Sequence, residues 1–93
     1  MLFRSTVRIP GPLRSFTAGA GELQAPAGTV AEVLRAISIS HPQLLSRLLD
    51  AEGGLRPYVN VFVGRANIRG LQGLSTPVAT GEVVSILPAV AGG

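Results

Sequence analysis

The chain has 93 residues, enough for one small domain that buries about 60–65% of its unfolded surface and leaves little room for a deep pocket. Its composition, 46% hydrophobic and 14% charged with 12 Gly and 7 Pro, is typical of a compact domain with many turns and argues against a disordered chain. Cys is absent, which excludes disulfides and thiol nucleophiles, and the net charge of +3 rests on Arg residues spread without a cluster, which argues against nucleic-acid binding.

Two short strands are predicted at the start of the chain. Leu2–Ile9 alternates as a half-buried strand does. One of its faces carries Phe3, Ser5, Val7 and Ile9. Pro10-Gly11-Pro12 ends this strand, and Glu22–Ala25, after a loop, is short enough to be a second strand. Because the two segments are close in sequence, we expect them to pair as a hairpin.

A main helix is predicted to begin at Thr29, because Thr29 can cap the first turn and Glu32 lies three residues on to complete a capping box. It ends near Ser40, because Pro42 suits the first turn of a second, short helix but not a helix interior. The expected apolar stripes are Val30, Val33, Leu34 and Ile37 in the first helix and Leu44, Leu45, Leu48 and Leu49 in the second. Glu32, Arg35 and Ser38 are expected to face outward.

Three strands are predicted in the second half of the chain. Gly53 and Gly54 are expected to end the second helix, after which Arg56–Val63 alternates and predicts the central strand. A brief strand around Ala66–Arg69 follows. The last strand is Glu82–Leu87, which leads directly into the end of the chain.

The order of these elements predicts an α+β fold. A helix between an early hairpin and the later strands lets the final strand lie parallel to the first through a right-handed crossover, with the helix packed over one face. This is the β-grasp, or ubiquitin-like, arrangement: a mixed sheet of about four to five strands, one main helix and a short second helix. We expect a β-grasp domain over residues 1–87 and a flexible C-terminal tail over residues 88–93.

The tail, Pro88-Ala89-Val90-Ala91-Gly92-Gly93, has no charged side chain and nothing larger than Val after Pro88. Without Cβ atoms, Gly92 and Gly93 can thread a narrow channel in another protein. The Gly93 carboxylate is a poor electrophile until it is activated, most simply by ATP to an acyl-adenylate. The chain has no Lys, no Cys and no phosphate-binding Gly-rich loop, so we expect a partner enzyme to supply this chemistry and the chain itself not to be an enzyme.

Three segments resemble the ThiS/MoaD family of ubiquitin-like sulfur carriers: the strand Tyr58–Val63, the turn and strand Gly81–Leu87, and the ending Pro88–Gly93. Within that family, the ending and the chain length are most similar to the carriers of thiocarboxylate-dependent cysteine synthesis. The resemblance implies that Gly93 is adenylated and converted to a thiocarboxylate that donates its sulfur. It also implies that the residues before Gly93 thread into the partner, namely Pro88, Ala89, Val90, Ala91 and Gly92.

The resemblance implies partner enzymes that carry the cofactors, with none bound by this chain. An activating adenylyltransferase or sulfurtransferase of the MoeB/ThiF type would use ATP. A PLP-dependent cysteine synthase would use the sulfur on an activated serine, and a metallopeptidase-type hydrolase would release the cysteine. Two alternatives stay open: the small subunit of molybdopterin synthase, and a ubiquitin-like protein modifier or interaction module. The absence of Lys argues against a modifier that links to its own copies.

A candidate partner-docking face consists of Phe62, Tyr58 and Leu87. Phe62 and Tyr58 point away from the valines of their strand, which leaves an aromatic pair on the open side of the sheet. His41 stands at a helix boundary, where a capping or solvated role is expected, and we expect no metal site. No apolar run reaches the ~18–20 residues of a membrane span, so we expect a cytoplasmic protein.

Overall fold

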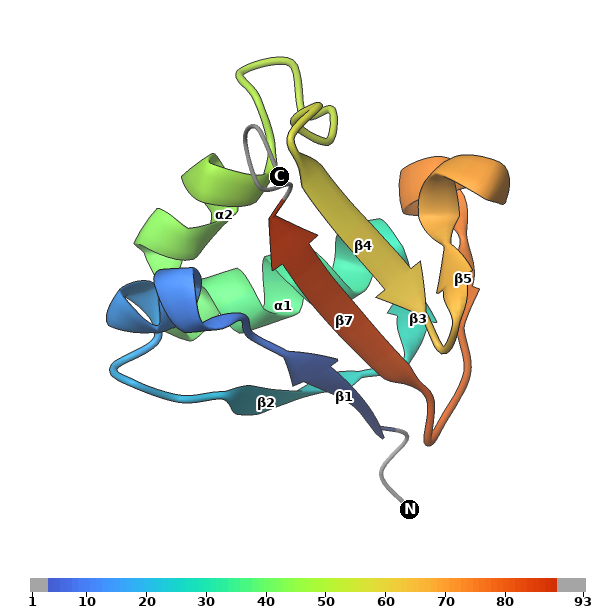
Figure 1. The fold of residues 1–93 in the computed structure, drawn as a ribbon. Helices are drawn as coiled ribbons and strands as arrows, with labels where there is room; N and C mark the ends of the chain where they lie inside the picture. Colours follow the sequence, from blue (N-terminus) through green and yellow to red (C-terminus); the bar gives the residue numbers. More distant parts are fainter. Residues whose placement is uncertain (1–3, 89–93) are drawn as a thin grey trace.

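The computed structural model describes residues 4–88, and its main feature is a five-stranded mixed sheet (Figure 1). The strand order is β2-β1-β7-β4-β5. β1 (Arg4–Arg8) pairs antiparallel with β2 (Glu22–Pro26) and parallel with β7 (Val83–Pro88). β7 also pairs antiparallel with β4 (Val59–Val63), and the short β5 (Ala66–Asn67) forms the other edge. The predicted β-grasp arrangement, with the first and last strands parallel neighbours, is confirmed.

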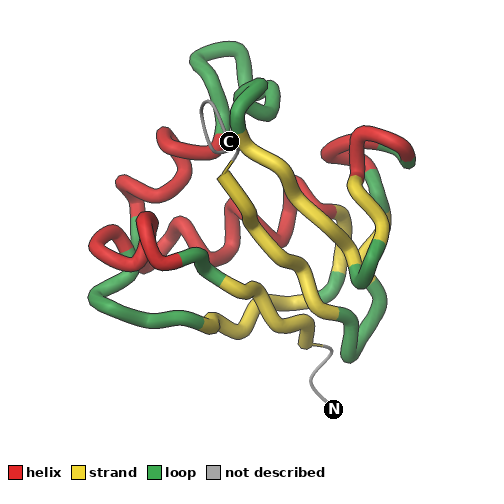
Figure 2. Tube along the Cα trace, in the orientation of Figure 1, coloured by secondary structure: helices red, strands yellow, loops and turns green. Residues whose placement is uncertain are grey.

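Several short elements connect these strands (Figure 2). β3 (Gly28–Thr29) and β6 (Pro77–Val78) form a separate two-stranded sheet. The 3-10 helices η2 (Ile68–Gly70) and η3 (Gly73–Ser75) follow β5. A further 3-10 helix, η1 (Gly11–Phe16), lies where the sequence predicts only a loop. Proline stands in its first turn, where the missing N–H removes no helical hydrogen bond.

Helix α1 (Val30–Ser40) begins with the predicted capping box. The Glu32 N–H donates to Thr29 Oγ1 at 3.2 Å, and the Thr29 N–H donates to Glu32 Oε1 at 2.9 Å, so two free donors of the first turn are satisfied. The four residues of the predicted apolar stripe are all buried. The expectation that Ser38 faces outward is wrong: Ser38 is buried, and its hydroxyl donates to the Leu34 carbonyl at 2.8 Å.

Helix α2 (Pro42–Leu48) is shorter than predicted. Gly53 and Gly54 do not end it, because Leu49 is already extended and forms a bridge with Leu55. Gly53, at a φ of 85°, instead serves the turn that follows. The predicted strand over Arg56–Val63 begins only at Val59, and it is not central, because β7 holds the middle position of the sheet.

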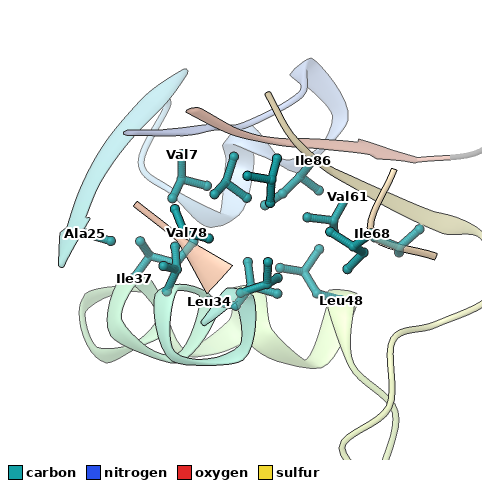
Figure 3. Close-up of a cluster of buried hydrophobic side chains, with 14 of the residues drawn as sticks. Val7, Ala25, Leu34, Ile37, Leu48, Val61, Ile68, Val78 and Ile86 are labelled. Carbon is teal, nitrogen blue, oxygen red and sulfur yellow. The ribbon is translucent and has the colours of Figure 1, made fainter. Parts of the chain in front are cut away.

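The core lies between α1 and α2 and one face of the sheet, and Figure 3 shows side chains from both layers pointing toward each other. Val7, Val61, Val84 and Ile86 enter it from three adjacent strands, and each is at most 1% exposed. Leu34 and Leu48, both fully buried, meet them from the helices. Helix α1 is part of the connection between the β1–β2 hairpin and the later strands. Its buried stripe packs against the sheet and so fixes the positions of all the long strands relative to one another.

We expect Leu34→Ala to lower the free energy of unfolding by about 2–5 kcal/mol, since it leaves a cavity at the centre of this core. Ile39 on the same helix is 83% exposed and provides the matched control: Ile39→Ala should change stability by no more than about 0.5 kcal/mol. Urea denaturation of both variants checks this. Equal losses in the two variants would contradict the assignment of the α1 faces.

A second prediction concerns the capping box and pH. The hydrogen bond from the Thr29 backbone, followed by the contact with the Thr29 side chain, lowers the pKa of Glu32 below its ordinary value of 4.5. As the pH falls, Glu32 is therefore protonated in the unfolded state before it is protonated in the folded state. The stabilisation by the Glu32 carboxylate is present above pH 4.5 and is lost as the pH falls through the lowered pKa of the folded state. In acid denaturation, Glu32→Gln should show a smaller loss of stability on acidification than the unmodified chain. Parallel curves for the two proteins would contradict the lowered pKa.

Candidate functional site

The carboxyl end of β7 is where the predicted tail begins. The first half of β7 is paired on both sides, with Val84 opposite Val7 of β1 and opposite Val63 of β4, and its second half is paired with β4. Its last residue, Pro88, is opposite Val59, so Pro88 belongs to the strand, and β7 extends one residue further than predicted. The other predicted tail residues lie outside the described part of the chain: Ala89, Val90, Ala91, Gly92 and Gly93.

Arg69 holds in place residues 56–59, the segment whose last residue is opposite the end of β7. One guanidinium nitrogen of Arg69 donates to the Arg56 carbonyl at 2.8 Å and to the Val59 carbonyl at 2.7 Å. The Val59 N–H also donates to the Arg56 carbonyl at 3.0 Å, and the Arg56 N–H donates to the Leu48 carbonyl at 2.9 Å. Sequence reasoning missed this role of Arg69, since nothing in the sequence relates Arg69 to a turn 10 to 13 residues earlier.

The structure brings two of the three predicted docking residues together. Phe62 of β4 is opposite Ser85, and Leu87 of β7 is opposite Asn60, so Phe62 and Leu87 lie diagonally on the face of the sheet turned away from the helices. Leu87 is 48% exposed and Phe62 is partly buried. The third residue, Tyr58, is 53% exposed in the turn just before β4 rather than in the strand.

The charges on this outer face lie toward its β2 edge. Arg8 is opposite Ser85 and forms an ion pair with Glu22 at 3.5 Å. Both side chains are about 60% exposed (63% and 60%), so the pair contributes only about 0–1 kcal/mol. The outer face therefore combines a small apolar area around Leu87 with charged and hydroxyl groups beside it, as protein-binding surfaces do.

No candidate metal centre appears within residues 4–88. Among these described residues, no group of three or more His, Asp or Glu side chains is placed to hold a metal ion. His41 is half-buried between α1 and α2 and its side chain makes no capping hydrogen bond. The Asp50 carboxylate accepts hydrogen bonds from the N–H groups of Glu52 and Gly54, so its role is to stabilise the turn after α2. No helix in the described part is both long and apolar enough to cross a membrane.

The family model of the ThiS family matches residues 7–93, which include the end of β1, all the later strands of the β-grasp sheet and the Gly-Gly ending. The chain belongs to the ThiS family. The family assigned from the strand and tail motifs is thereby confirmed.

Individual ThiS-family relatives agree with this membership. The chain is 38% identical to the sulfur carrier protein CysO of Mycobacterium tuberculosis over 95% of this chain and 97% of CysO. The crystal structure of the Amycolatopsis orientalis BexX/CysO complex contains a chain with a TM-score of 0.90 and 37% identity, covering 96% of this chain and 99% of that one. The small archaeal modifier protein 3 of Haloferax volcanii is 37% identical over 70% of both chains. The match to CysO, a sulfur carrier protein, over nearly the whole of both chains confirms the predicted class of small carrier protein.

Proposed function

We propose that the reactive group of this carrier is the Gly93 carboxylate. A partner enzyme adenylates it with ATP and releases pyrophosphate, and a sulfur nucleophile then displaces AMP to leave a thiocarboxylate. The thiocarboxylate is the sulfur donor for cysteine synthesis. The observation that carries this proposal is the direct junction between β7, which is paired on both sides, and the small, uncharged ending Ala89–Gly93.

The residues of the chain explain why the chemistry belongs to partners. The sequence has no Cys to form a thioester or persulfide and no Lys to neutralise phosphates. The relationship to CysO favours an activating enzyme of the MoeB/ThiF type, a PLP-dependent cysteine synthase and a metallopeptidase-type hydrolase as the partners. The solved complex of CysO with BexX supports the general expectation that this chain acts by docking onto another protein.

A ubiquitin-like modifier is the second candidate. The similarity to small archaeal modifier protein 3 favours it, and it uses the same terminal carboxylate, now joined to a target lysine through an isopeptide bond. The absence of Lys in this chain means that any such product would carry single copies and not chains linked through side-chain amines.

The carrier function is tested by the intact mass of the protein. After incubation with an activating enzyme, ATP and sulfide, the full chain should gain the mass difference of one oxygen replaced by one sulfur. A variant lacking Gly92 and Gly93 should show no gain and an unchanged circular dichroism spectrum, because the two residues lie beyond the β-grasp strands. Failure of the full chain to gain sulfur while a known CysO does so in the same reaction would refute the carrier proposal. Isopeptide-linked Gly93 in cell lysate would favour the modifier instead.

The docking face is tested by Leu87→Arg. We propose that the outer face around Leu87 and Phe62 contacts the activating enzyme, so a charge at Leu87 should raise Kd about tenfold or more. Ile39→Arg is the matched control: Ile39 is also a large exposed aliphatic residue, but it lies on α1, which covers the opposite face of the sheet. Titration calorimetry with the activating enzyme measures both variants. An equal effect at the two positions would exclude this face as the docking surface.

A further inference from the structure

The end of β7 depends on its pairing with β4. The register of β7 with β1 covers Val83 to Ser85, whereas the register with β4 continues to Pro88, which is opposite Val59. At the other end of β4, the Gly64 N–H donates to the Val83 carbonyl at 2.9 Å. Because hydrogen-bonded and non-hydrogen-bonded pairs alternate along an antiparallel ladder, Val59 and Pro88 form a pair without hydrogen bonds between them. The N–H that proline lacks therefore costs nothing at this position.

Arg69 holds the β4 member of this last pair. Because Val59 exchanges no hydrogen bond with Pro88, its carbonyl points to the other side of β4, where β5 pairs with only the last two residues of the strand. The Arg69 guanidinium takes the place of a neighbouring strand there. One of its nitrogens donates to the Val59 carbonyl at 2.7 Å and to the Arg56 carbonyl at 2.8 Å. Both bonds have a charged donor, which makes them stronger than bonds between neutral groups.

The backbone of Arg69 is itself fixed in η2. Its N–H donates to Asn67 Oδ1 at 2.9 Å, and the preceding residue, Ile68, is fully buried in the core. The guanidinium therefore connects a fixed point of the core to the residue with which β4 begins, Val59.

The two proposed docking residues do not need this contact. Phe62 and Leu87 belong to pairs that exchange hydrogen bonds between β4 and β7, because these pairs lie two and four positions from the pair that Gly64 forms with β7. Loss of the Arg69 guanidinium should therefore leave the docking face in place and loosen only the pair beyond it.

We propose that Arg69 is a positioning residue for the activation of this carrier, a role that rests on the proposed function. The guanidinium fixes Val59, and with it the place at which Pro88 ends the sheet. A strand that ends at a fixed place gives the residues after it a fixed starting point on the docked body. Because alignment of the reacting groups contributes strongly to rate, freedom at this starting point lowers turnover and leaves docking intact.

Amide hydrogen exchange measures the hold of Arg69 on the strand. Arg69→Met removes the guanidinium, so exchange of the Val59 N–H, which donates to the Arg56 carbonyl, should accelerate about tenfold or more. The Gly64 N–H, just beyond the other end of β4, should keep its rate in this variant. Arg65→Met, which alters an exposed arginine of the β4–β5 turn, is the matched control and should leave the Val59 rate unchanged.

Two exchange results would overturn the proposal. An unchanged Val59 rate in Arg69→Met would show that the guanidinium does not hold the strand. Equal acceleration at Val59 and Gly64 would make Arg69 a residue of general stability.

The activation reaction gives the readout that a purely structural role would not change. With the activating enzyme and ATP, pyrophosphate release at varied concentrations of the chain yields kcat and KM. Arg69→Met should lower kcat about tenfold or more and change KM by less than about twofold, and Arg65→Met should change neither. An unchanged kcat for Arg69→Met would refute the positioning role. A loss carried by KM alone would also refute it, because Arg69 would then belong to the docking surface.

Failure of the proposed function gives a different result. If the unmodified chain releases no pyrophosphate while a known CysO does so in the same reaction, the carrier proposal is refuted, and the role of Arg69 in activation is refuted with it. The exchange rate at Val59 needs no partner, so it would still decide whether Arg69 holds the end of the strand.

Discussion

The parallel pairing of β1 with β7 is the contact on which the rest of this structure depends. It joins the first and last strands of the domain, and it requires a crossover over one face of the sheet, which α1 covers with a fully buried stripe. The pairing also places β7 in the middle of the sheet, between β1 and β4. β7, which ends at Pro88, is therefore held by β1 from the start of the chain, by α1 from its middle and by β4 from its second half.

This position of β7 explains how so small a domain can serve a chemical function. The chain has no Cys and no Lys, and its described part holds no group of three or more His, Asp or Glu side chains placed to bind a metal ion. In the proposed function, the chain supplies the terminal carboxylate and a partner enzyme supplies the groups that activate it. The outer face around Leu87 is the surface proposed for docking onto that partner.

Local patterns in the sequence were sufficient for most of the fold and for the proposed reactive residue. The capping box of Thr29 and Glu32, the alternating valines of β4 and the stripe of α1 each depend on neighbours a few residues away, so they can be read without the tertiary structure. The order of those elements leaves few compact topologies, and the β-grasp is one of them. The chemistry proposed for Gly93 also needs no tertiary structure, because it follows from the ending together with the family resemblance of the strand segments Tyr58–Val63 and Gly81–Leu87.

Only the tertiary structure decided the features that rest on contacts between distant segments. Arg69 holds the turn beside the end of β7 through carbonyl groups 10 and 13 residues earlier in the chain. The burial of Ser38 depends on how α1 packs, although its hydroxyl donates to a carbonyl of the same helix. By itself the sequence determined where most of the strands and the two α-helices lie, since these follow from local patterns. Which strand is central is set by packing across the whole chain.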